Sequence, residues 1–156
     1  MLADWIKFSA VSHAMSPRAK NILLIEDHAD SATVFARVLQ TYGHTVRVAN
    51  SVAEAEQACE QGNFDLLLCD IELPDGNGLD LLRRARMSCP TTQGIVISAH
   101  EDEGRKRAAK EAGFKEYLVK PFRADDLQAA MKRVEAYFPA EADRLGTGPA
   151  LPPKDH

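Results

Sequence analysis

Four short apolar runs, each of which ends in a polar side chain, constrain the fold of this chain more than any other feature. The runs cover residues 21–25, 64–69, 94–97 and 117–119, and the polar side chains that follow them are Glu26 and Asp27, Asp70, Ser98 and Lys120. Runs of this length are typical of buried strands, and the Pro and Gly residues after Asp70 indicate a loop. If the strands are parallel neighbours, their carboxyl ends converge on one cleft.

Helical patterns alternate with these runs. They cover residues 30–42, 51–62, 79–87 and 103–112, with a fifth that ends before Pro139 and a further short strand at 44–49. Ser51 and Glu54 have the spacing of a capping box at the start of the second helix. Five strand-helix units with short connections predict an α/β fold, in which a doubly wound parallel sheet carries helices on both faces.

Composition excludes several classes of protein. The chain has 156 residues, a net charge of -4 and a pI near 5.7, which fits one domain without general affinity for nucleic acid or anionic membrane. No apolar stretch reaches the length of a membrane span. The three cysteines are widely spaced and form no CxxC pair, so we expect neither a disulfide framework nor a cysteine zinc site. A cytoplasmic location is expected.

The chain divides into three parts. Residues 21–138 carry the alternating pattern and form the expected domain. Residues 1–20 are interpreted as an N-terminal extension or linker. Residues 139–156 are rich in proline and poor in large apolar side chains, so a disordered tail is expected there.

The expected cleft holds three carboxylates, a hydroxyl and an ammonium group. Glu26, Asp27 and Asp70 offer the oxygen ligands that Mg²⁺ prefers, with Mn²⁺ as a substitute, and the backbone carbonyl of Glu72 is a further candidate ligand. A carboxylate beside a bound cation can attack phosphorus, and phosphoryl transfer needs mainly positioning and charge neutralisation. Lys120 can supply part of that neutralisation.

The same residues carry a resemblance to a known family. The motifs are Leu-Ile-Glu26-Asp27, Leu-Leu-Cys-Asp70-Ile-Glu-Leu-Pro74-Asp-Gly-Asn-Gly78, Ile-Val-Ile-Ser98-Ala99 and Glu-Tyr117-Leu-Val-Lys120-Pro121-Phe122. Their type, order and spacing resemble the receiver domain of bacterial two-component response regulators. This resemblance implies a flavodoxin-like (βα)5 fold with strand order 2-1-3-4-5.

The resemblance also implies roles for individual residues. Asp70 would accept a phosphoryl group from a phosphohistidine, and Glu26 and Asp27 would hold the metal with it. Ser98 and Lys120 would bind the phosphoryl oxygens. Tyr117 would be an aromatic switch residue, and a cis peptide would join Lys120 to Pro121.

Partners follow from the same resemblance. A sensor histidine kinase or a histidine phosphotransfer protein would supply the phosphoryl group, and a downstream protein effector would read the new surface. We expect no direct contact with nucleic acid or membrane, and no turnover chemistry beyond autodephosphorylation. The segment Glu-Asp-His-Ala-Asp, residues 26–30, also resembles receivers attached to hybrid histidine kinases.

Alternatives and departures remain. An aspartate-nucleophile phosphatase would use the same metal, but it typically places a second aspartate two residues after the nucleophile, where this chain has Glu72. A degenerate receiver that only binds partners would not need its acidic residues, and this chain retains Glu26, Asp27 and Asp70. His28 stands where many receivers have another acid, Leu73 replaces Met and Ser98 replaces Thr. His28 and His100 are interpreted as solvated loop residues, and the basic run 105–107 with Lys110 as either a docking patch or a solvated helix face.

Overall fold

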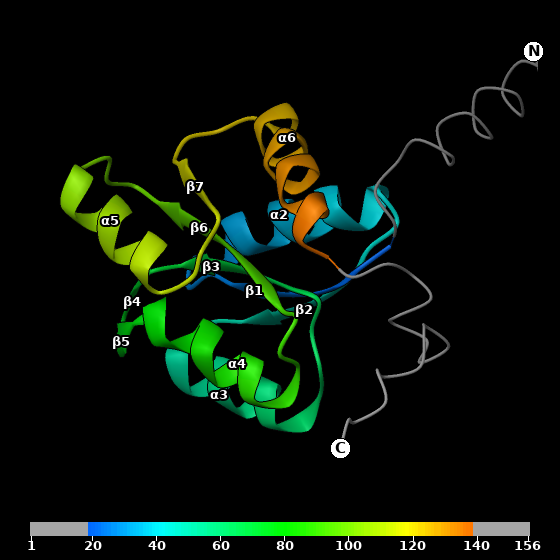
Figure 1. The fold of residues 1–156 in the computed structure, drawn as a ribbon. Coiled ribbons are helices and arrows are strands. Elements are labelled where there is room, and N and C mark those ends of the chain that lie inside the picture. Colours follow the sequence, from blue (N-terminus) through cyan, green and yellow to red (C-terminus); the bar gives the residue numbers. More distant parts are fainter. Residues whose placement is uncertain (1–18, 139–156) are drawn as a thin grey trace, which may run out of the picture.

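A five-stranded parallel sheet forms the centre of the molecule (Figure 1). The computed structural model describes residues 19–138 of the chain. The strands are β1 (Asn21–Ile25), β2 (Thr45–Ala49), β3 (Leu66–Asp70), β6 (Gln93–Ser98) and β7 (Glu116–Val119). They lie in the order β2-β1-β3-β6-β7, with parallel pairing throughout. Counted along the chain, this is the order 2-1-3-4-5, so the predicted fold is confirmed.

Helices cover both faces of the sheet, as expected for a doubly wound fold (Figure 1). One face packs against α2 (Ala29–Thr41) and α6 (Ala124–Val134), and the other against α3 (Val52–Gln61), α4 (Leu81–Ser88) and α5 (Glu103–Glu111). Two short 3-10 helices, η1 (Gly78–Asp80) and η2 (Glu135–Tyr137), precede α4 and follow α6. Within the described residues, no helix is both long and apolar enough to cross a bilayer.

Strand β3 lies in the middle of the sheet and is buried on both faces. Leu67 packs in the cluster beneath α3 and α4, whereas Leu66 and Leu68 pack beneath α2 and α6. All three side chains are at most 1% exposed, and burying a leucine stabilises a fold by about 1.5–3 kcal/mol. The strand that ends in Asp70 is therefore anchored on both sides.

The segment after Asp70 differs from the simple loop that the sequence predicts. It forms an antiparallel pair of two-residue strands, β4 (Glu72–Leu73) and β5 (Gly76–Asn77). At its tip the Asp75 carboxylate accepts hydrogen bonds from the N–H groups of Val52 and Ala53, at 2.8 and 3.0 Å. These two bonds lower the pKa of Asp75 and attach the hairpin to the first turn of α3, where a negative charge is favoured.

Helix starts agree with the local sequence signals. Ser51 accepts a hydrogen bond from the Glu54 N–H at 3.1 Å, which confirms one half of the predicted capping box. The Glu54 side chain accepts the N–H of Asn50 rather than that of Ser51, so the reciprocal half is displaced by one residue. Asp102 caps α5 as Ser51 caps α3, through the Arg105 N–H. The predicted tail, residues 139–156, and residues 1–18 of the predicted extension lie outside the described residues.

A buried histidine joins the start of β1 to the start of β2. His44 is 6% exposed, and its Nδ1 atom accepts a hydrogen bond from the Lys20 N–H at 3.0 Å. Burial and the nearby Lys20 charge lower the pKa of His44, although Glu135 and Asp65 act in the opposite direction. The folded state therefore favours the neutral imidazole.

Acidification should weaken the fold through His44. Because the folded-state pKa lies below the ordinary value of 6.5, this contribution is complete above about pH 6.5 and is lost as the pH falls through the lower, folded-state pKa. His44→Asn keeps a side-chain acceptor that does not titrate. Between about pH 7 and pH 5, its free energy of unfolding should fall less than that of the native chain. Parallel profiles in urea unfolding would contradict the assignment.

Candidate functional site

The carboxyl ends of β1, β3 and β7 bring two carboxylates and an ammonium group together. Lys120 follows β7, and its Nζ donates to Glu26 Oε1 at 2.6 Å and to Asp70 Oδ2 at 2.8 Å. Glu26 is fully buried and Asp70 is 4% exposed. Buried charges are costly unless they are paired, so Lys120 offsets two of them at once.

The amine of Lys120 is held in its charged form. Burial acts to lower its pKa, but the hydrogen bonds to Asp70 and Glu26 outweigh burial and raise the pKa above the ordinary value of 10.5. The cleft therefore contains a fixed positive charge next to the side chain that the sequence predicts to be phosphorylated.

Asp27 lies beside Glu26 with an unsatisfied oxygen. Its Oδ1 atom is buried and accepts no hydrogen bond from the described residues, and the His28 Nδ1 atom lies 3.4 Å away. The other oxygen of Glu26, Oε2, accepts the His28 N–H at 3.1 Å. One potential ligand atom from each of these three residues lies within 4.8 Å of the other two. A buried carboxylate oxygen without a donor suits a cation, so the group fits a divalent metal.

Asp70 is held at both oxygens. Its Oδ1 atom accepts the Glu72 N–H at 2.9 Å, while Oδ2 faces Lys120. Gly78 lies directly beneath, where a Cβ atom would come within 2.6 Å of Cys69 Sγ and 3.1 Å of the Asp70 carbonyl oxygen. This close approach explains why the loop that returns beneath Asp70 has glycine at this position. The buried Cys69 thiol has a pKa well above its ordinary value because of burial, so it acts as a core side chain.

Ser98 at the end of β6 belongs to a second polar group. Its hydroxyl donates to Glu72 Oε1 at 3.3 Å and accepts the His100 N–H at 3.0 Å. Glu72 Oε2 in turn lies 2.9 Å from His100 Nε2 and 3.6 Å from an Arg105 nitrogen. The side chain of Glu72 thus connects the hydroxyl of the cleft to helix α5.

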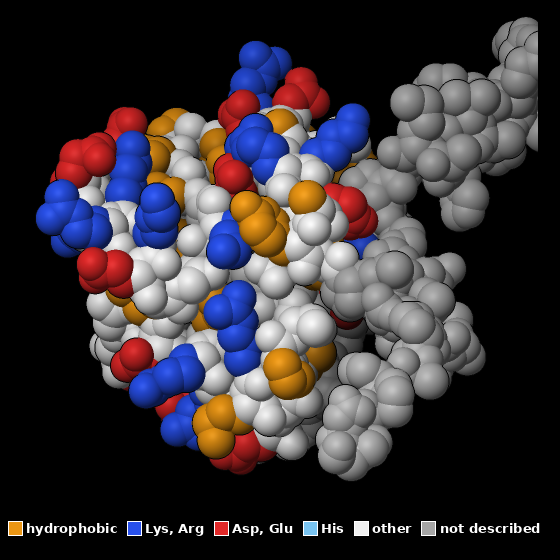
Figure 2. All heavy atoms as spheres, viewed as in Figure 1, with side chains coloured by type: hydrophobic (Ala, Val, Ile, Leu, Met, Phe, Trp, Pro, Cys, Tyr) orange, Lys and Arg blue, Asp and Glu red, His pale blue; other side chains and the backbone are white. Residues whose placement is uncertain are grey.

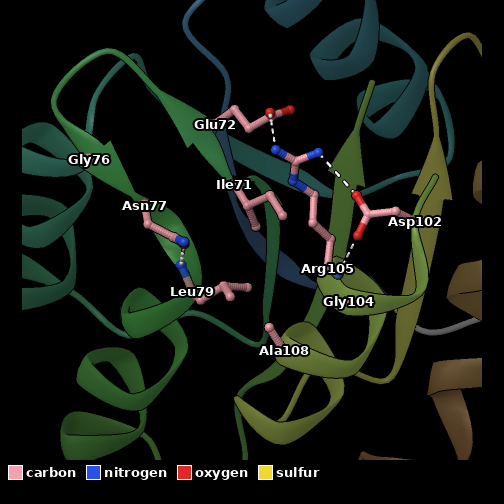
Figure 3. A pocket seen from close by; sticks show the side chains of 9 residues that line it. All are labelled: Ile71, Glu72, Gly76, Asn77, Leu79, Asp102, Gly104, Arg105 and Ala108. Carbon is pink, nitrogen blue, oxygen red and sulfur yellow. Dashed lines mark hydrogen bonds and ion pairs between the residues drawn. The ribbon is translucent and has the colours of Figure 1, made fainter. Parts of the chain in front are cut away.

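A groove between the β4-β5 hairpin and α5 lies next to this group. Figure 3 shows Arg105 between Glu72 on the hairpin and Asp102 at the start of α5. The cavity has a volume of about 650 Å³, and Ile71, Leu79 and Ala108 form its apolar part. Residues expected only as a basic run therefore include one, Arg105, that faces the loop after Asp70.

The rest of that basic run fits a solvated helix face better than a docking patch. Lys106 lies 3.7 Å from Glu101 and 3.9 Å from Glu103. Figure 2 shows acidic and basic side chains interspersed over the α5 end of this face. Because opposite charges are close on the helix, the run does not form a uniformly positive surface.

Tyr117 on β7 is half-buried and points toward the loop after Ser98. Its hydroxyl donates to the His100 carbonyl oxygen at 2.7 Å. The Lys120–Pro121 peptide bond is cis. A role of Tyr117 as a switch residue and of the Glu72 carbonyl as a metal ligand both stay predictions. The side-chain contacts of Glu72 and Arg105 were not predicted from the sequence. The only sequence signal for them was that Glu72, two residues after Asp70, is acidic.

A family model for the response regulator receiver domain matches residues 22–132. The chain belongs to this family. The Alginate biosynthesis transcriptional regulatory protein AlgB of Pseudomonas putida is 36% identical over 109 residues, which cover 70% of this chain and 24% of that protein. The DNA-binding transcriptional regulator NtrC of Azospirillum brasilense is 32% identical over 146 residues, covering 85% of this chain and 30% of that protein.

A solved structure supports the same membership. The receiver domain of sensor histidine kinase PA1611 from Pseudomonas aeruginosa, solved with a magnesium ion coordinated in its active-site cleft, is 27% identical, with a TM-score of 0.66. The alignment covers 76% of this receiver chain and 99% of that domain.

The relatives bear on the expected partners. This receiver chain spans about a quarter of the length of AlgB and 30% of NtrC. Both relatives are named as transcriptional regulators, and one is named as DNA-binding. The expectation of no direct contact with nucleic acid therefore finds no support in these relatives. An origin in a hybrid histidine kinase is not confirmed either.

Replacement of Lys120 should destabilise the fold, because two buried carboxylates in the cleft would lose the cation that they share. Lys120→Met leaves Glu26 and Asp70 buried without their shared cation, and removal of one partner of a buried ion pair is strongly destabilising. Since the lysine side chain is 20% exposed, we expect the free energy of unfolding in chelator to fall by about 2–3 kcal/mol.

A double variant separates charge from packing. Glu26→Gln in the Lys120→Met background removes one of the two carboxylates and should recover part of the loss, whereas Lys120→Arg should lose less than Lys120→Met. If Lys120→Met unfolds at the same urea concentration as the native receiver, the ion pair contributes nothing to stability.

Proposed function

We propose that this receiver is a phosphoacceptor in a two-component phosphorelay and that Asp70 carries the phosphoryl group. The observation that carries the proposal is the position of Asp70. It ends the central strand, and its Oδ2 atom lies 2.8 Å from the Lys120 ammonium, which also holds Glu26 of the β1 end at 2.6 Å. Membership of the receiver family supports the same assignment.

The transfer uses side chains that the strands already align. A carboxylate oxygen of Asp70 forms a bond to phosphorus as the bond from phosphorus to the histidine nitrogen of the donor breaks. Lys120, next to Asp70, neutralises charge on the phosphoryl oxygens, and Ser98 donates a hydrogen bond to one of them. A short bond of this kind is stronger than the bond that the serine makes to the Glu72 carboxylate, because that bond is 3.3 Å long, well beyond the usual length for a charged acceptor.

We assign the metal site to Glu26, Asp27 and Asp70, with the Glu72 carbonyl as a further ligand. The buried, unsatisfied Oδ1 atom of Asp27 supports a cation there. Magnesium in the cleft of the related PA1611 receiver supports the choice of Mg²⁺, with Mn²⁺ as a substitute. When bound, the cation neutralises charge on the carboxylates and on the incoming phosphoryl group.

Phosphorylation would act on the surface through Ser98. A new acceptor on Asp70 draws the serine hydroxyl away from Glu72, and this frees the loop that carries His100. Tyr117 is hydrogen-bonded to that same loop, so it would turn inward as the loop moves. The surface formed by α5, β7 and α6 would change shape, and a protein effector that prefers the new shape would bind.

The donor in this proposal is a sensor histidine kinase or a histidine phosphotransfer protein. The effector is either a separate protein or a further part of a longer chain, as in the transcriptional regulators that this receiver resembles over a quarter of their length. All three cysteines are free, which fits a reducing compartment such as the cytoplasm.

Acetyl phosphate with Mg²⁺ tests the acceptor role. We expect one phosphoryl group per molecule by intact-mass spectrometry, and none in Asp70→Asn, because an amide lacks the anionic oxygen that attacks phosphorus. Asp80→Asn is the matched control, since Asp80 is an exposed acid of η1. An adduct that persists in Asp70→Asn would refute the assignment.

The same experiment addresses turnover. We propose a switch rather than a turnover enzyme, so the adduct should be acid-labile in the way of an acyl phosphate, and aryl phosphates should not be hydrolysed in many cycles. Sustained hydrolysis that depends on Asp70 would instead favour the aspartate-nucleophile phosphatase.

Beryllofluoride, which stands in for the phosphoryl group, tests the switch. It should shift the amide resonances of residues 98–122 more than those of residues 44–62, because Ser98 and Tyr117 lie on the first segment. Ser98→Ala should blunt these shifts and leave Mg²⁺ binding intact, since its hydroxyl is absent from the proposed ligand set. Equal shifts in both segments would rule out the coupling.

A further inference from the structure

Strand β2 forms one edge of the sheet, and among the described residues it has a strand neighbour on one side only. At its two ends, the Thr45 N–H and the Ala49 carbonyl are bonded toward the β1 side, both at 3.0 Å. Successive residues of a strand direct their backbone groups to opposite sides. The N–H and C=O groups of Val46 and Val48 therefore point outward, away from β1.

A groove of about 400 Å³ lies beside this edge, between β2 and α2. Val48 forms its wall on the β2 side, and Ala32 and Ala36 are among the α2 residues that face it. Val48 is 38% exposed, so an apolar side chain and unpaired strand backbone meet solvent at the same place. An open strand edge invites pairing with another chain, and folded proteins commonly cover such edges.

The segment before β1 has the sequence pattern of a strand. From Ile6 to Ala10, apolar and polar residues alternate strictly as Ile-Lys-Phe-Ser-Ala, which is typical of a strand with one buried face. This run belongs to residues 1–18, which lie outside the described residues. A strand this short is not stable without a sheet to join and an apolar surface to cover.

The chain enters the sheet next to the open edge. The Lys20 carbonyl, immediately before β1, accepts the N–H of Thr45 at the start of β2. A strand added outside β2 would lie two strand spacings from β1, or about 10 Å. The chain between Ala10 and Lys20 can span about 30 Å. The segment can therefore turn past the start of β2 and run antiparallel to it.

We propose that residues 5–10 pair with the outer edge of β2 as an added antiparallel strand and that Ile6 and Phe8 occupy the groove beside α2. The backbone of the segment pairs with Val46 and Val48. Because side chains alternate along a strand, Ile6 and Phe8 share the face that meets the groove. In strand addition of this kind, main-chain hydrogen bonds supply affinity and side-chain pockets supply specificity. The inference concerns a surface apart from Asp70 and does not rest on the phosphoacceptor role.

Amide hydrogen exchange in the full chain tests the pairing. The outward N–H groups of Val46 and Val48 should exchange slowly in the native protein, because each donates to the added strand. Phe8→Asp places a charge against the apolar groove, and it should speed exchange at both positions by about tenfold or more. Leu2→Asp adds the same charge outside the alternating run and should leave both rates unchanged. Fast exchange of both amides in the native protein would overturn the inference.

The single tryptophan of the chain, Trp5, reports docking independently. Its emission should be blue-shifted and shielded from acrylamide in the native protein, and solvent-exposed in Phe8→Asp. Val48→Lys should give the same exposed spectrum, because it places a charge in the groove. Val34→Lys is the matched control, since Val34 is a 57% exposed valine of α2 that does not line the groove. An equal response in both lysine variants would contradict docking in the groove.

Dilution separates this occupant from the two others that fit the edge, a second copy of the chain and a separate protein. Blue-shifted emission that persists on dilution of a monomer, as measured by light scattering, supports docking within one chain. Emission that shifts as a dimer dissociates assigns the edge to a second copy. A solvent-exposed Trp5 at every concentration leaves the edge to another protein, and either of these two results overturns the inference. Phosphorylation of Asp70 in Phe8→Asp then tests the proposed function separately.

Discussion

The ammonium group of Lys120 holds two buried carboxylates that belong to different strands, and the rest of the cleft is arranged around this contact. Glu26 and Asp70 lie at 2.6 and 2.8 Å from the same nitrogen. Without a shared cation, two acids this deeply buried would repel each other at the centre of the sheet. Because Lys120 uses one oxygen of each acid, the remaining oxygens stay available for a metal, for the loop after Asp70 or for an incoming phosphoryl group.

The positions of these charges follow from the sheet, which is why the sequence reveals them. In a parallel sheet, the carboxyl ends of neighbouring strands share one edge. Each apolar run that ends in a polar residue therefore delivers that residue to the same cleft. Glu26, Asp70, Ser98 and Lys120 could be placed at this edge from the alternation of strands and helices, once the strands were taken as parallel neighbours. The strand order came from the resemblance to receiver domains, and it was confirmed.

The sequences of the loops between strands and helices do not indicate where the loop side chains lie. Asp75 caps helix α3 from a position 23 residues away from Val52, and Glu72 reaches Ser98 and Arg105 on other elements. These contacts depend on where a short hairpin turns in space, and hydrophobic periodicity says nothing about such a turn. The sequence therefore indicated a loop at this place without indicating its hairpin or the ion pairs of Glu72.

The residues of this cleft fall into two groups, those that are buried at strand ends and those whose side chains are exposed. Glu26, Asp70 and Lys120 are tied to one another and to buried strands, so a change in any of them disturbs the core as well as the chemistry. His28 and Glu72 begin at the strand ends but turn their side chains to the solvent side, where they are 72% and 36% exposed. Substitution at these two positions costs the core little. The side chains at these two positions, including the one that holds the Ser98 hydroxyl, can therefore change while the sheet and its central ion pair stay as they are.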